Sequence, residues 1–199
     1  MKQVPIWTAA ALLAVALAWQ PAALAQPKFA IKPVAQKKLN QLPAGALYWR
    51  VETFPTFAEA QAATGSTSLA AEVAGKAWLF TLGPKGGATA GGTKVAEIGP
   101  VPAIAASEYL LRVNHTGGAP GAKTPVHTHP GSEAFYVLAG ETSSHTSQGV
   151  KRVGVGQSAT GRVADTPMQV SSSGSTDLHS LVMFVVDADK PFSSPAKFP

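Results

Sequence analysis

Three side chains of the kinds that bind metal ions lie close together in the sequence: His127, His129 and Glu133. On a β-strand, residues i and i+2 point to the same face, so the two imidazoles can face one point. Pro130-Gly131 then provides a tight turn, after which Glu133 can return opposite the histidine pair. Two histidines and one carboxylate are a ligand set for divalent transition metals that leaves further coordination positions open. The spacing therefore predicts a metal site.

The residues after Glu133 indicate where its carboxylate points. Phe135 and Val137 share its face of a strand that the alternation predicts over residues 134–138. Glu133 should therefore point into an apolar interior, where an unpaired carboxylate is costly. A cation held beside the two imidazoles would remove that cost. The open alternative is a polar turn on the surface, with both imidazoles in water.

The complete pattern is Gly121-x5-His127-x-His129-x3-Glu133-x6-Gly140, and it resembles the first motif of the cupin superfamily. The resemblance implies an all-β cupin-type double-stranded β-helix, or jelly-roll barrel, over about residues 109–186. It also implies a divalent transition metal (Fe, Mn, Zn, Ni or Cu) held by His127, His129 and Glu133. Gly121 and Gly140 are the expected structural turn glycines.

The second cupin motif departs from the family pattern. Gly154-x-Gly156 begins it as expected, but Asp165 replaces the usual turn glycine and Met168 stands where a fourth ligand histidine is expected. Three outcomes are open: three protein ligands with open metal positions, weak thioether binding by Met168 that favours a soft ion such as copper, or loss of metal binding. The competing interpretation of Met168 is an ordinary core filler.

Short strand signals separated by Gly and Pro turns surround these motifs, and they favour an all-β sandwich or barrel. A capping box at Thr56 and Glu59 predicts one short N-terminal helix. The predicted strands cover residues 47–54, 77–82, 94–98, 109–115, 134–138, 149–155 and 178–186. We expect four parts: a signal peptide (1–25), an N-terminal extension with strands flanking the barrel (26–107), the cupin domain (108–187) and an irregular C-terminal strap (188–199).

Composition limits the classes of function. The chain has 199 residues, of which 45% are hydrophobic and 14% charged, and it contains no Cys. The absence of Cys excludes disulfides, thiolate metal sites and thiol catalysis. The net charge is +5, but Lys and Arg are spread thinly along the chain. We therefore expect no nucleic-acid partner.

The first 25 residues have the features of a cleaved secretory signal. Lys2 precedes an apolar stretch over residues 7–19, and Ala23-Leu24-Ala25 matches the small-x-small rule before Gln26. The apolar stretch is short for a membrane span of about 20 residues, although an uncleaved anchor is the open alternative. We expect an exported protein, periplasmic or secreted, with no stable membrane span after cleavage.

Three classes of function remain open at this stage. The first is a metal-dependent small-molecule enzyme of the dioxygenase or isomerase type, for which the sequence names no catalytic residue. The second is a non-catalytic metal or small-ligand binding module. The third is a structural barrel with a degenerate metal site. The resemblance also implies that a homodimer could form by exchange of an arm, for which residues 26–43 are the candidate.

Overall fold

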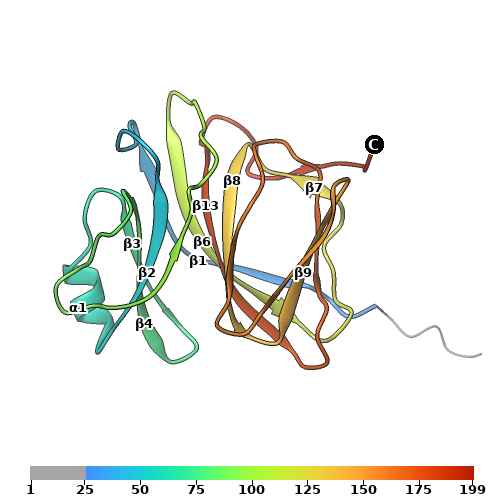
Figure 1. The fold of residues 1–199 in the computed structure, drawn as a ribbon, viewed down its shortest axis with the longest axis horizontal. Helices are drawn as coiled ribbons and strands as arrows, with labels where there is room; N and C mark the ends of the chain where they lie inside the picture. The colour runs from blue at the N-terminus through green and yellow to red at the C-terminus, as the bar shows by residue number, and fades with distance from the viewer. Residues whose placement is uncertain (1–25) are drawn as a thin grey trace, which may run out of the picture.

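The structure, a computed structural model, describes residues 26–199, which fold almost entirely into β-strands (Figure 1). The predicted signal peptide, residues 1–25, lies outside the described residues. Within the described part there is one helix, α1 (Phe57–Ala62), which begins at the predicted capping box of Thr56 and Glu59. Among the elements described, no helix has the length and apolar character that a membrane crossing requires. The all-β prediction is confirmed.

The central sheet has five antiparallel strands and forms the middle of the molecule. Its strand β13 pairs with β6 on one side and with β8 on the other, and all of its residues except His179 are buried, on both faces of the sheet. This position explains its almost continuous apolar sequence. In spatial order, the strands of this sheet are β1 (Ala30–Leu39), β6 (Tyr109–Gly118), β13 (Leu178–Asp187), β8 (Gly131–Ala139) and β11 (Ser158–Thr160).

A second, N-terminal sheet packs against one face of the central sheet (Figure 1). The largest hydrophobic core lies between them, where Trp49 and Phe80 meet Leu181 and Met183 of β13, all with no exposed surface. Helix α1 covers the other face of this sheet. In spatial order, its strands are β3 (Ser68–Val73), β4 (Lys76–Gly83), β2 (Tyr48–Phe54) and β5 (Thr93–Ile98).

The opposite face of the central sheet forms a barrel with a third group of strands. Isolated bridges join Lys123 to Ser171 and His127 to Met168, so the chain leading into β7 runs beside β12. The central sheet is thus shared between the N-terminal layer and the barrel. The third group contains β10 (Gly149–Gly154), β9 (Glu141–Thr146) and β12 (Gln169–Ser172), together with the pair β7 (His127–Thr128) and β14 (Ser194–Pro195).

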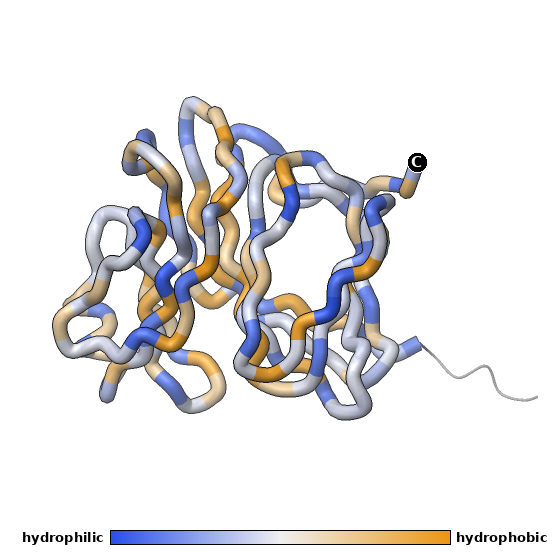
Figure 2. The backbone as a smooth tube through the Cα atoms, in the orientation of Figure 1, coloured by the Kyte–Doolittle hydropathy of each residue, from blue (hydrophilic) through white to orange (hydrophobic). Residues whose placement is uncertain are grey.

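The two-faced character of the central strands follows from their sequence. Figure 2 shows hydrophobic and hydrophilic residues interspersed along the backbone. In β6, Leu111 and Val113 point into the main core, whereas Arg112 and Asn114 line a cavity on the barrel side. Strand alternation therefore separates core residues from barrel-lining residues on the same element.

The segment 26–43 differs from the arm that the sequence suggests. Residues Ala30–Leu39 form β1, which pairs with β6 of the same chain at the edge of the central sheet. Homodimerisation through this segment stays a prediction.

Candidate functional site

The barrel contains a cup-shaped cavity of about 680 Å³ between the central sheet and the strands around β7. This volume lies in the range that small-molecule sites usually occupy. His127, His129 and Glu133 all line the cup. The structure thus brings the three predicted residues to one cavity, the first two on β7 and the turn that follows, and the third on β8.

Both histidines are held in the same tautomer by backbone carbonyls. His127 Nδ1 lies 2.9 Å from the carbonyl oxygen of Pro125, and His129 Nδ1 lies 2.6 Å from that of Phe192. Because a carbonyl oxygen only accepts hydrogen bonds, each Nδ1 carries the proton and donates it. In this tautomer the lone pair of each ring is on Nε2, and within residues 26–199 neither Nε2 forms a hydrogen bond. Metal-binding histidines are commonly oriented in this way.

His129 is the more buried of the two, with 6% of its surface exposed. Its ring packs between Phe184 of β13 and Phe192 of the C-terminal segment, with centroid distances of 4.9 and 4.8 Å. Burial, together with the charge interactions with His127 and Arg112, lowers the pKa of His129 to about 4, although the hydrogen bond to Phe192 acts in the opposite direction. The ring is therefore neutral at physiological pH.

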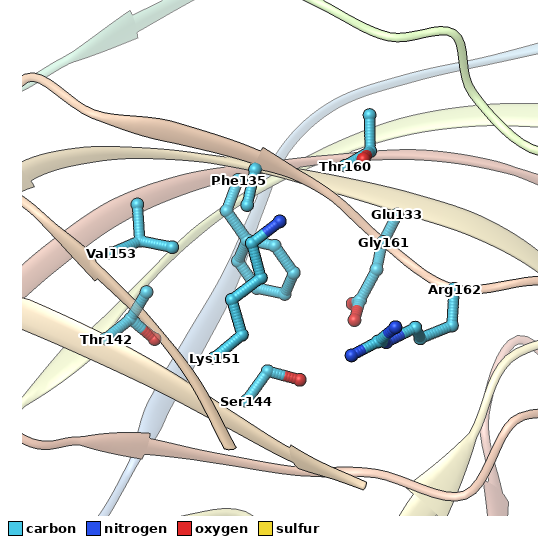
Figure 3. Close-up of a pocket in the computed structure, with 10 residues that line it drawn as sticks. Glu133, Phe135, Thr142, Ser144, Lys151, Val153, Thr160, Gly161 and Arg162 are labelled. Atoms are coloured by element: carbon cyan, nitrogen blue, oxygen red, sulfur yellow. The ribbon is translucent and has the colours of Figure 1, made fainter. Parts of the chain in front are cut away.

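Glu133 points into the interior, as its strand alternation predicts. Only 3% of it is exposed, and its Oε1 is a buried acceptor with no hydrogen-bond partner. Burial raises its pKa to about 8, so the carboxyl group is mostly protonated at neutral pH. Figure 3 shows Glu133 and Arg162 extending into a second, smaller space of about 20 Å³ between the strands, beside Ser144. Such a space holds about one water molecule.

The three predicted ligands do not form a complete metal-binding group in this arrangement. Within residues 26–199, no three side chains of His, Asp, Glu or Cys lie close enough together to hold an ion. The histidine pair nevertheless fits a metal, since its rings meet edge to face with centroids 5.0 Å apart and its Nε2 atoms have no other partner. Glu133 does not complete the set as it lies here.

Met168 lies directly opposite His127. Their backbones exchange two hydrogen bonds of 2.9 Å, and side chains at such paired positions share one face. The Met168 side chain is 3% exposed and packs in an apolar cluster with Phe135 and Phe184. Its neighbour Asp165 has a φ of 61°, the left-handed conformation that the turn glycine of the motif would adopt. The position of Met168 thus follows the motif, while its surroundings are those of a core residue.

The two motif glycines have the backbone conformation that turns require. Gly121 has a φ of 85° and Gly140 a φ of 70°. A Cβ on Gly140 would also lie 2.6 Å from the carbonyl oxygen of Asp177, which leaves no room for a larger residue.

Several residues of the cup were not predicted from the motif. Arg112 and Asn114 of β6 line its wall, Phe192 and Pro195 of the C-terminal segment line it from another side, and Phe29 lines it from the N-terminal segment. The alternation of Arg112 and Asn114 with apolar residues was the available signal. The residues from the two chain ends gave no signal, because their contacts with the cup are distant in sequence.

Residues 117–184 match the family model described as the cupin domain. This part of the chain is therefore of the cupin type, and it runs from the end of β6 into β13, including both histidines and Glu133. None of the curated proteins compared with the chain matches it.

Solved structures similar to part of the chain include three bacterial proteins. A cupin-like protein from Thermotoga maritima shares 15% identity over 44% of this chain and 65% of its own, with a TM-score of 0.39. The polyketide cyclase RemF from Streptomyces resistomycificus shares 20% over 45% and 62%, with a TM-score of 0.37. A DMSP lyase from Ruegeria pomeroyi shares 20% over 43% of each chain, with a TM-score of 0.37. The chain thus spans less than two thirds of the length of each.

Proposed function

We propose that this protein binds a small organic molecule in its cup and holds a divalent transition metal there through His127 and His129. The observation that carries the proposal is the pair of imidazoles whose Nδ1 atoms are fixed by carbonyls and whose Nε2 atoms have no hydrogen-bond partner among the described residues at the wall of a cavity. When bound, the metal would supply a Lewis acid with open positions for a ligand. The protein's own groups would orient the imidazoles and exclude water through the apolar walls.

Metal loading of the purified protein tests this proposal. After treatment with a chelator, the protein is dialysed separately against Fe²⁺, Mn²⁺, Zn²⁺, Ni²⁺ and Cu²⁺, and the bound metal is measured by mass spectrometry. We expect about one equivalent of at least one ion. The double variant His127→Ala/His129→Ala should lose it, while His145→Ala, at an exposed position outside the cup, should keep it. Full occupancy in the double variant would overturn the assignment.

Two further variants test the remaining predicted ligands. Glu133→Gln keeps the shape of the side chain but cannot ionise, so a fall in metal affinity of roughly tenfold or more would assign the carboxylate to the metal. Met168→His replaces a soft sulfur by a borderline nitrogen. If the thioether is a ligand, this change should shift the preference from Cu towards Zn or Ni. An unchanged preference supports the core-filler role of Met168.

Catalysis by the cup is the second candidate function, of the dioxygenase or isomerase type. The observation that favours it is Glu133, a carboxyl that burial keeps protonated at neutral pH in the wall of the cup. Such a group can act as a general acid. Oxygen uptake and product formation with a panel of phenols, thiols and keto acids separate an enzyme from a binder. A metal-loaded protein that leaves the whole panel unchanged supports binding alone.

Export is part of the proposal. The apolar stretch over residues 7–19 and the Ala23-Leu24-Ala25 sequence support cleavage before Gln26. N-terminal sequencing of protein recovered outside the cytoplasm should begin at Gln26. Recovery of an intact N-terminus in the membrane fraction would favour the uncleaved anchor.

A further inference from the structure

One positively charged side chain in the cup, that of Arg112, is held in position but has no anionic partner among the described residues. Arg112 lies on β6 and lines the cup. Its Nε donates a 2.9 Å hydrogen bond to Oδ1 of Asn114, which is 2% exposed. Its guanidinium carbon lies 4.2 Å from the centre of the Phe192 ring, a cation–π contact. These two contacts fix the plane of the guanidinium group before any ligand arrives.

Within residues 26–199, Arg112 forms no ion pair, and its two terminal nitrogens donate no hydrogen bond. Glu133 is the one acidic residue among those that line the cup. It sits two strands away, because Arg112 and Glu133 both pair with Phe184 on opposite sides of β13. Neighbouring strands lie about 4.8 Å apart, so the aromatic ring stands between the two groups.

An arginine remains charged under all ordinary conditions, so its partial burial without a counter-ion is unfavourable. Burial also lowers the pKa of Arg112, because desolvation disfavours the charged form of the guanidinium group. A bound anion would offset this cost and would use the two free nitrogens. The remaining charged groups of the cup, Lys28 and Lys123, are also positive and would favour an anion at longer range.

Most of the remaining wall of the cup is apolar. Its walls include Phe29, Phe135, Val170, Val182 and Phe184, and its volume of about 680 Å³ suits a compact organic molecule. Two parallel N–H groups of one guanidinium match the two oxygens of a planar carboxylate. The site therefore combines one bidentate anion-binding group with an aromatic and aliphatic enclosure.

We infer that the cup takes a small organic carboxylate with a compact apolar body, and that Arg112 binds the carboxylate group. This inference rests on the proposed small-molecule function of the cup and names its ligand class. It does not depend on the metal, because the anion-binding group is on β6 and the histidines belong to β7 and the turn after it.

Binding of two matched probes to chelator-treated protein tests the inference. The probes are 3-phenylpropionate and 3-phenylpropanol, which share an apolar body and differ in the carboxylate. Calorimetry or ligand-observed NMR should show the carboxylate binding at least roughly tenfold more tightly, as expected for a charge-assisted bidentate pair. Equal binding of the two probes, or binding of neither, would overturn the inference.

Variants of Arg112 assign the residue. Arg112→Met should remove the preference for the carboxylate, and Arg112→Lys should keep only part of it because an ammonium cannot form the bidentate pair. Lys85→Met, which removes one positive charge near Tyr48 of the N-terminal sheet, should leave the preference unchanged. Thermal unfolding shows whether each variant is folded. Should Arg112→Met fail to fold, Arg112→Lys decides the outcome, and an undiminished preference in either variant assigns the carboxylate to another group.

The two proposals can fail separately. If wild-type protein binds metal through the histidines but does not distinguish the probes, only the carboxylate inference is refuted. If chelator-treated protein distinguishes the probes through Arg112 but takes up no metal, only the metal assignment is refuted.

Discussion

Two buried glutamates in different parts of the molecule differ in whether their carboxyl oxygens have hydrogen-bond partners. Glu52, in the N-terminal sheet, is fully buried and accepts hydrogen bonds from Arg50 Nε at 3.0 Å, Thr89 N at 2.8 Å and Thr89 Oγ1 at 2.7 Å. Glu133, in the barrel, is 3% exposed and has one oxygen without any partner. Burial alone would raise the pKa of both, but the bonds from Thr89 and Arg50 lower that of Glu52.

The difference separates a structural carboxylate from one available for function. Glu52 anchors the glycine-rich loop that contains Thr89 to the N-terminal sheet, and its bonding capacity is used within the fold. Glu133 keeps an unused acceptor beside a cavity, which the folded protein tolerates by holding the group protonated. Perturbed titratable groups of this second kind are concentrated at functional sites.

The largest expected effect concerns the pH dependence of stability at Glu133. Its folded pKa of about 8 lies above the unfolded value of 4.5. Its contribution to the free energy of unfolding is therefore fully present below pH 4.5 and is lost as the pH rises towards 8. The shift corresponds to about 5 kcal/mol. In metal-free protein, Glu133→Gln should remove this decline, as measured by urea unfolding at a series of pH values.

The wild type serves as the control for that series, because all other titrating groups are common to the two proteins. Parallel curves for wild type and Glu133→Gln between pH 5 and 8 would mean that the carboxyl group is already ionised in the folded state. The contrast with Glu52 would then disappear.

The next largest effect is expected at Glu52. Glu52→Gln leaves Arg50, whose side chain is 14% exposed, without its counter-ion. Removing one partner of a buried ion pair costs about 3 kcal/mol or more. Because the pKa of Glu52 is lowered, its contribution is present above its unfolded value of 4.5 and is lost as the pH falls through the folded value. The two carboxyl groups should thus give pH slopes of opposite sign, and a variant as stable as wild type at pH 7 would contradict the structural role.

The smallest of the three effects is expected at Thr89. Thr89→Val keeps the backbone N–H bond to Glu52 but removes the hydroxyl that donates to Oε2 and accepts from Arg50 at 3.1 Å. Loss of the hydrogen bond to the fully buried Glu52 costs about 2 kcal/mol, whereas the partly exposed Arg50 can replace its bond to Thr89 with one to water. Urea unfolding measures the loss, and the pKa of Glu52, followed by NMR, should rise in the same variant. An unchanged pKa would show that the backbone bond and Arg50 are sufficient.

Much of the barrel could be predicted from the sequence because its signals are local. The strand over residues 134–138 and the inward direction of Glu133 follow from the alternation of side chains, and both are confirmed. The capping box at Thr56 is confirmed for the same reason, since its two hydrogen bonds join residues three apart. The match of residues 117–184 to the cupin domain agrees with the resemblance of the first motif.

Other features could not be predicted because they depend on distant contacts. Strand β9 has the polar sequence of Glu141–Thr146 and becomes a strand only by pairing with β10 and β12. The unpaired state of Arg112 depends on Phe184, which separates it from Glu133 across the sheet. The tautomer of His129 depends on the carbonyl of Phe192, 63 residues away.

The location of the two ends of the described chain has a practical consequence for purification. Gln26 lines the cup, Pro195 pairs with His127, and the ring of Phe198 lies 4.6 Å from that of His145. In Figure 1 the C-terminus and the start of the described chain both lie on the barrel side of the molecule. A polyhistidine tag fused at either end of the described chain would therefore lie near the cup, and its imidazoles could bind metal ions there. Metal stoichiometry should be measured on protein whose tag has been removed or contains no histidine.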